Sequence, residues 1–178
     1  ARVVASLRHP NTLKLFDFGR TQAGQLYLVS ELLHGQPLSD RLELGPLDEA
    51  TTLEVLRQVL GALAEAHDAG VLHRDLKPAN LHVEQVGGEA FYRVLDFGLA
   101  KVADVTTMTA TGRIMGTPPY MSPEQARGAT LGPGTDLYSM GVVAFECLSG
   151  CVPFEGSTPY SVLLKHINEP PPPITDFN

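Results

Sequence analysis

Two short polar motifs that flank a predicted β-hairpin constrain this chain more than any other feature of its sequence. The motifs are HRDLKPAN at residues 73–80 and DFG at residues 96–98. Apolar runs predict short strands over residues 81–84 and 91–95, joined by a turn at Gly87-Gly88. Antiparallel pairing of these strands brings the end of the first motif beside the start of the second.

The polar side chains of the two motifs suit a metal-bound polyphosphate held beside a hydroxyl group. Phosphoryl transfer depends on positioning and charge neutralisation more than on covalent chemistry. Mg²⁺ prefers hard oxygen ligands, which Asn80 and Asp96 offer, and Lys77 offers a mobile cation for a phosphate. Asp75 remains to accept or orient the proton of the incoming hydroxyl. The alternative is a loop with helix-capping acids and a solvated lysine, which the joint pattern makes the weaker interpretation.

The two motifs resemble the catalytic loop and the DFG segment of eukaryotic-type (Hanks-type) serine/threonine protein kinases. The resemblance covers essentially all 178 residues, and the phrases GTPPYMSPEQARG and DLYSMGVVAFECLSG look most like bacterial members of that family. It implies a two-lobed α+β fold, with residues 1–33 as the remnant of the small lobe and the hinge. Residues 34–178 would form the large lobe without its final helices. The family's Gly-rich loop and nucleotide lysine would precede Ala1, so the chain resembles a kinase domain truncated at both ends.

The resemblance implies a role for each polar residue of the site. Asp75 would be the catalytic base and Lys77 the phosphate clamp, while Asn80 and Asp96 would be magnesium ligands. ATP and Mg²⁺ would then be the cofactors, and Ser or Thr hydroxyls of proteins the acceptors. Thr117 can hydrogen-bond toward Asp75 and Lys77, and the Lys77–Thr117 combination matches the serine/threonine branch of the family.

The resemblance also implies an adenine pocket at a hinge. Main-chain groups around Glu31 and Leu33 would hydrogen-bond the adenine, and Ser30 falls at the gatekeeper position, where its small side chain leaves space. Leu81 and His82 resemble the floor of this pocket, although the family prefers an apolar side chain where His82 stands. An ordinary edge strand and turn is the alternative interpretation of the hinge residues.

Residues 99–121 are rich in hydroxyl groups and resemble the kinase activation loop. Four threonines are candidates for phosphorylation: Thr106, Thr107, Thr109 and Thr111. A phosphate there adds about −1.5 to −2 charges, for which Arg74 is a suitable partner. A flexible polar loop is the alternative interpretation of this composition.

Two further structural roles follow from the resemblance. Four residues fall at the positions of the side-chain stack that couples the lobes, called the regulatory spine: Val4, Leu15, His73 and Phe97. Asp136 falls at the position whose carboxylate hydrogen-bonds the backbone of the HRD loop.

Hydrophobic periodicity predicts the remaining elements. A long helix follows Asp48, whose carboxylate can cap it, and Gly70 supplies its end. Its buried face is predicted from leucines at helical spacing, with a packed histidine after them: Leu53, Leu56, Leu60, Leu63 and His67. The other predicted elements are the end of a helix over 1–7, strands over 11–18 and 25–31, an apolar helix over 135–149 that includes Leu137, and a helix over 159–168.

The amino-acid composition limits the possible binding partners and the cellular compartment of the protein. The net charge of −7 argues against a nucleic-acid surface, and no apolar run is long enough for a membrane span. The two cysteines, Cys147 and Cys151, provide neither a disulfide framework nor a Cys-rich zinc site. We therefore expect a cytoplasmic protein, with any membrane tether outside these residues. The resemblance implies a role in signal transduction and is compatible with a homodimer for autophosphorylation.

Two other functions compete with the protein kinase. A pseudokinase that signals by shape is disfavoured by the intact Asp75, Asn80 and Asp96, whereas His82 keeps it open. A small-molecule phosphotransferase shares a similar loop, but the SPE segment at residues 122–124 favours protein substrates. Because the phosphate loop and its lysine are missing from residues 1–178, we expect this polypeptide alone to bind ATP weakly and to turn over little.

Overall fold

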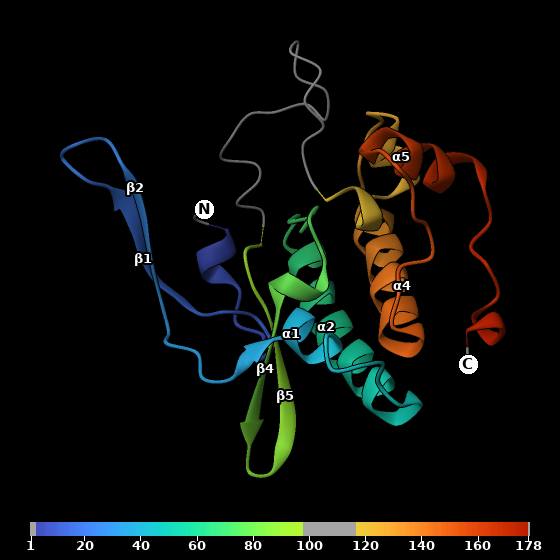
Figure 1. The fold of residues 1–178 in the computed structure, drawn as a ribbon. Coiled ribbons are helices and arrows are strands. Elements are labelled where there is room, and N and C mark those ends of the chain that lie inside the picture. The colour runs from blue at the N-terminus through green and yellow to red at the C-terminus, as the bar shows by residue number, and fades with distance from the viewer. Residues whose placement is uncertain (1–2, 98–116, 178) are drawn as a thin grey trace.

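Two long helices run through the centre of the larger part of the molecule (Figure 1). The structure is a computed structural model and describes residues 3–97 and 117–177. Helix α2 spans Glu49–Asp68, and Asp48 caps it as predicted, its Oδ1 accepting the Thr51 amide at 2.8 Å. Helix α4 spans Pro133–Ser149 and ends at Gly150, whose φ of 78° is a left-handed conformation that glycine adopts without a steric penalty. The two helices pack against each other and carry most of the core.

The predicted buried face of α2 is wrong for two of its four leucines. Leu53 is 57% exposed and Leu60 is 36% exposed, whereas Leu63 is buried. The residues that α2 does bury are mostly small or β-branched: Thr52, Val55, Gln58, Val59, Ala62, Leu63 and Ala66. Short side chains on this face let α4 and strand β5 approach closely, which a count of leucines does not reveal. The same error occurs in α4, where Leu137 is 51% exposed.

Strands β3 (Gln36–Pro37), β4 (Leu81–Val86) and β5 (Glu89–Val94) form an antiparallel sheet in the order β3-β4-β5. The predicted hairpin is therefore present, and both of its strands extend further toward the Gly87-Gly88 turn. Leu81 pairs with Val94, and both side chains are fully buried. Because successive side chains alternate between faces, His82 and its partner Arg93 lie on the opposite face of the hairpin.

A second hairpin, β1 (Leu15–Arg20) and β2 (Leu26–Ser30), stands away from the helices at the left of Figure 1. The prediction of a strand over residues 11–18 is wrong at its start, because residues 11–14 run along the end of β5 instead. The Leu13 amide donates to the Val94 carbonyl at 3.0 Å, and the Val94 amide donates to the Asn11 carbonyl at 2.7 Å. Where the end of a helix was predicted, the described residues contain one 3₁₀ turn, Val4–Ser6.

Short helices complete the larger part. Helix α1 spans Leu38–Leu42, α3 spans Pro123–Ala126, and α5 spans Pro159–Asn168, as predicted for this last helix. Single 3₁₀ turns occupy Pro78–Asn80, Pro118–Tyr120 and Ile174–Asp176. Within the described ranges, none of these helices combines the length and the apolar character required to cross a bilayer.

Candidate active site

The backbone of the HRD segment is fastened to helix α4 by Asp136, as predicted. The Asp136 carboxylate is fully buried and accepts the amides of His73 and Arg74, each at 2.8 Å. Arg74 has a φ of 70°, a conformation that costs a non-glycine residue roughly 1–2 kcal/mol. The Gln125 side chain holds the Arg74 carbonyl from the other side at 2.7 Å. These bonds on both sides of Arg74 maintain the strained turn, which aims the next residue, Asp75, away from the core.

His67 contributes a third hydrogen bond to the same carboxylate. Its Nε2 lies 2.8 Å from Asp136 Oδ2, so helix α2 also contacts the residue that supports the catalytic loop. The sequence predicts His67 as a packed histidine, and this polar role is missed. Its position in the last turn of α2, just before the HRD motif, is the only signal in the sequence that suggests it.

Four predicted catalytic side chains converge on one point. Asp75 Oδ1 accepts the Thr117 hydroxyl at 2.9 Å, and Asp75 Oδ2 lies 2.8 Å from Lys77 Nζ. Lys77 Nζ also lies 2.7 Å from Thr117 Oγ1, so the three groups form a closed triangle. Asn80 Nδ2 donates to the Asp75 carbonyl at 2.8 Å and approaches Oδ2 at 3.3 Å. The expected Thr117 contacts are thus present, and the cluster keeps a carboxylate and an ammonium side by side at a partly exposed position.

The hairpin brings Asp96 to this cluster through the main chain. The Leu95 amide donates to the Asn80 carbonyl at 2.9 Å, and His73 Nε2 contacts the Leu95 carbonyl at 2.7 Å. Burial lowers the pKa of His73, which favours the neutral ring in this contact. Asp96 itself is exposed, with a φ of 56°, so its carboxylate faces solvent.

The oxygen donors here fit a magnesium ion. Asn80 uses its Nδ2 group to contact Asp75, which leaves Oδ1 as an acceptor, and Asp96 offers an exposed carboxylate. Mg²⁺ typically takes one or two protein oxygens and completes its shell with phosphates and water. An amide and a carboxylate on adjacent chain segments are therefore a suitable pair of ligands.

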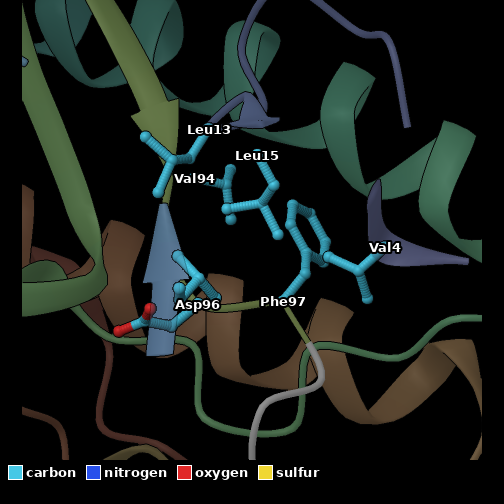
Figure 2. Close-up of a pocket in the computed structure, with 7 residues that line it drawn as sticks. Val4, Leu13, Leu15, Val94, Asp96 and Phe97 are labelled. Atoms are coloured by element: carbon cyan, nitrogen blue, oxygen red, sulfur yellow. The ribbon is translucent and has the colours of Figure 1, made fainter. Parts of the chain in front are cut away.

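Phe97 lies among the residues predicted for the regulatory spine. Figure 2 shows its ring between Leu15 and Val4, with the Asp96 carboxylate turned away from them. The ring also meets His73 edge to face, with ring centroids 5.1 Å apart. Segments from the 3₁₀ turn, strand β1, the catalytic loop and the end of β5 are thus in contact through these four side chains.

The residues predicted for the hinge lie at the end of β2, which includes Ser30, and in the connection from β2 to β3. Ser30 Oγ donates to the Glu31 carbonyl at 3.1 Å, and Leu33 is half-buried. Leu81, predicted for the floor of the adenine pocket, is fully buried in the core, whereas His82 is half-buried on the hinge-facing side of the hairpin. His82 Nε2 lies 3.0 Å from the carbonyl of His34, which ties this unusual residue to the hinge main chain.

An open groove of about 560 Å³ adjoins the catalytic cluster. Lys77 and Thr117 lie on one side of it, and Tyr120 and Glu146 on another. The Tyr120 hydroxyl donates to Glu146 at 2.7 Å, and burial raises the pKa of the Glu146 carboxyl. Glu146 was not predicted, because it lies within an apolar helix and its partner is 26 residues away.

The four candidate phosphorylation sites lie outside the described residues, as does Gly98 of the DFG motif. They are Thr106, Thr107, Thr109 and Thr111. Their predicted partner Arg74 lies within the described part, is half-buried and follows His73 in the catalytic loop.

A catalytic loop and a DFG segment fastened in this way are typical of protein kinases. The sequence model of the protein kinase domain matches residues 1–172, and the chain belongs to this family.

Bacterial serine/threonine-protein kinases are among its relatives. The chain is 44% identical over 181 residues to the serine/threonine-protein kinase pkn3 of Myxococcus xanthus, covering 98% of this chain and 33% of the relative. It is 42% identical over 179 residues to the serine/threonine-protein kinase PknA of Mycobacterium tuberculosis, covering 98% of this chain and 41% of that protein. The serine/threonine-protein kinase PrkC of Bacillus subtilis is 36% identical to the chain over 179 residues, which cover 100% of this chain and 27% of that protein. The chain thus spans well under half the length of these curated relatives.

Proposed function

We propose that the protein containing this chain is an ATP-dependent protein kinase that phosphorylates Ser or Thr hydroxyls of proteins. The observation that carries the proposal is the triangle of Asp75, Lys77 and Thr117, with distances of 2.7–2.9 Å between its polar atoms. A carboxylate that is oriented by two donors is prepared to accept a hydrogen bond from a substrate hydroxyl. Membership of the kinase family and the names of the bacterial relatives support the same reaction.

Each residue of the cluster has a part in this reaction. Bound magnesium–ATP supplies the phosphoryl group and much of the charge neutralisation, with Asn80 and Asp96 holding the metal. Asp75 orients the acceptor hydroxyl and takes its proton as the hydroxyl oxygen bonds to the γ-phosphorus of ATP and the bond from that phosphorus to the bridging oxygen, which leaves with ADP, breaks. Lys77 lies beside Asp75, where its ammonium group balances the negative charge on the transferred phosphoryl oxygens. Thr117 fixes both side chains.

The test is Asp75→Asn in the full-length protein, assayed with a generic protein substrate. Loss of a positioned base typically lowers the rate by about 100-fold to 10,000-fold. The KM for ATP and the melting temperature are expected to change little, because Asp75 is partly exposed and the amide preserves its shape. Asp40→Asn, an exposed acid on α1, is the matched control and should retain full activity. Activity of Asp75→Asn within about threefold of the unsubstituted enzyme would contradict the proposed role.

A pseudokinase remains the second candidate, and His82 is the observation that favours it. An imidazole bound to the hinge occupies the position where the family presents an apolar floor to adenine. The His82→Leu substitution separates the two functions: a pseudokinase gains ATP affinity without turnover, whereas a kinase is active with or without the change.

The domain division predicted above is also part of the proposal. Residues 1–33 are assigned to the remnant of the small lobe and the hinge, and residues 34–178 to the large lobe without its final helices. Residues 1–178 alone are expected to bind ATP weakly and to turn over little, with ATP titration by calorimetry as the measurement. Vigorous phosphorylation of a generic substrate by residues 1–178 would contradict this.

Regulation by phosphorylation of the four candidate threonines is proposed as well, with Arg74 as the partner of the phosphate. Simultaneous substitution of Thr106, Thr107, Thr109 and Thr111 by alanine should lower the activity of the full-length protein. Unchanged activity would contradict this proposal without affecting the catalytic roles.

A further inference from the structure

We propose that three side chains of the β4–β5 hairpin form a clasp that positions the hinge for adenine. The hinge clasp consists of His82 and Glu84 on β4 and Arg93 on β5, and it holds Glu31 and His34. The inference rests on the proposed function, since it assigns the hinge to the nucleotide, but its structural part is independent of any ligand.

Arg93 is the centre of the clasp. Its Nε lies 3.0 Å from a Glu84 carboxylate oxygen, and its Nη1 lies 3.1 Å from Glu31 Oε1. The same Nη1 donates to the Pro10 carbonyl at 3.1 Å. Glu31 Oε1 also accepts the Lys14 amide at 2.8 Å. One guanidinium group therefore connects the hairpin, the first hinge residue and the segment that precedes β1.

The peptide groups of His34 are held from both directions by side chains of β4. Glu84 Oε1 accepts the His34 amide at 2.8 Å, and His82 Nε2 lies 3.0 Å from the His34 carbonyl. The imidazole acts as donor in the second contact, since a carbonyl can only accept. This accounts for the histidine that stands where an apolar residue is expected: it fastens the hinge main chain.

Strand register explains why these three side chains act together. His82 pairs with Arg93 across the hairpin, and Glu84 lies two residues further along β4 on the same face. On the opposite face, Leu81 and Val94 are fully buried in the core. The three side chains of the clasp therefore lie on a part of the molecule that is itself fixed, and their partners Glu31 and His34 lie in the hinge.

The ion pairs of the hinge clasp are partly buried, so their contribution to the free energy is larger than that of fully exposed pairs. The side chains of Arg93, Glu31 and Glu84 retain 20%, 23% and 11% of their exposure. Ion pairs that are partly withdrawn from water are screened less by salt than pairs on the surface. Arg93 and Glu31 also line a cavity of about 500 Å³ together with residues of the 5–15 segment.

The first experiment measures hydrogen exchange of the hinge amides in the protein without nucleotide. Glu84→Ala should accelerate exchange of the His34 amide by about 10-fold to 100-fold, the factor that corresponds to loss of a hydrogen bond to a charged group. Arg93→Met, which leaves that hydrogen bond in place but removes the guanidinium partner of Glu84 and Glu31, should accelerate exchange of the hinge amides by a smaller factor. Arg93→Lys, which keeps one ion pair, should give an intermediate rate. Arg57→Met is the matched control, because Arg57 pairs with Glu54 on the exposed face of α2 and should leave the hinge unchanged.

Two outcomes of the exchange experiment would exclude the hinge clasp. Exchange of the hinge amides in Arg93→Met within about twofold of the unsubstituted protein would exclude it. Equal acceleration of amides throughout α2 and the hinge would also exclude it, because this indicates global destabilisation rather than a local release. His82→Leu keeps the ion pairs and should accelerate only amides of residues 33–36, which supplies a test free of charge changes.

The second experiment connects the clasp to the nucleotide. In the full-length protein, Arg93→Met should raise the KM for ATP by about 10-fold while kcat changes by less than about threefold, since Arg93 lies away from Asp75. A fall in kcat at unchanged KM would contradict a role in positioning adenine.

If Asp75→Asn keeps its activity while the hinge amides of Arg93→Met exchange faster, the proposed function fails and the clasp stands. The reverse pair of results excludes the clasp alone.

Discussion

The molecule contains two antiparallel hairpins of similar length whose surroundings differ completely. On β4–β5, Leu81, Tyr92 and Val94 are at most 3% exposed. Within residues 1–178, large apolar side chains of β1–β2 are widely exposed, with Phe16 at 59% and Leu26 at 60%. An isolated two-stranded hairpin is marginally stable in water at best. In this part of the protein, packing against α2 fixes the hairpin that Asn80 and Asp96 flank.

Gln58 on α2 shows how the buried hairpin is fixed. Its Oε1 accepts the Tyr92 amide at 2.8 Å and the Asn11 side chain at 2.7 Å, and its Nε2 donates to the Ala90 carbonyl at 3.0 Å. A single buried amide thus satisfies two backbone groups of β5 and attaches the segment before β1. Among the described residues, β1 and β2 receive no comparable side chain from a helix.

The largest expected difference is between one aromatic residue in each hairpin. Tyr92→Ala should lower the free energy of unfolding by about 3–5 kcal/mol, the usual cost of removing a buried aromatic side chain. Phe16→Ala should lower it by less than about 1 kcal/mol, since the Phe16 ring is mostly solvated. Urea unfolding followed by circular dichroism measures both. Similar losses for the two variants would show that β1–β2 is as firmly packed as β4–β5.

A smaller effect is expected from the amide that anchors β5. Gln58→Leu leaves the Tyr92 amide and the Ala90 carbonyl without their partner, which should cost about 2–3 kcal/mol for the buried groups left unpaired. Gln25→Leu, in the exposed turn between β1 and β2, is the control and should change stability by less than about 0.5 kcal/mol. A loss below about 1 kcal/mol for Gln58→Leu would mean that water or other side chains replace the bonds.

The stability of the protein should depend on pH through Glu84 of the β4–β5 hairpin. Although burial raises it, hydrogen bonds from the His34 amide and Arg93 leave the pKa of Glu84 below its usual value. The unfolded chain then binds the proton more tightly, so the stabilising contribution is present above the unfolded pKa and is lost as the pH falls through the folded value. Glu84→Gln should reduce the slope of stability against pH below pH 4.5, by at most about 1.4 kcal/mol per pH unit. An unchanged acid slope in Glu84→Gln would contradict the cost assigned to protonating this residue.

The sequence was sufficient for features that depend on short spacing, and insufficient for those that depend on distant partners. The motif residues Asp75, Lys77 and Asn80 and the cap at Asp48 were predicted, because each is defined by its neighbours. The side chains of Arg93 and Glu84 drew no interpretation, because their partners in the hinge are 62 and 50 residues away. The buried face of α2 was misassigned because a large apolar residue is common on both faces of a helix in a large lobe.

The smallest expected effect comes from the polar link within the exposed hairpin. The Tyr27 hydroxyl donates to Asp17 Oδ2 at 3.1 Å, and this bond, together with the Asp17 charge, raises the pKa of Tyr27. Because Asp17 is accessible to water, a solvent molecule can replace the hydroxyl that Tyr27→Phe removes, and stability should change by less than about 0.5 kcal/mol. Differential scanning calorimetry near neutral pH measures this. A loss above about 1 kcal/mol would indicate that β1–β2 is held by its own cross-strand bonds, and the contrast with β4–β5 would then lie in the number of supporting contacts rather than in their presence.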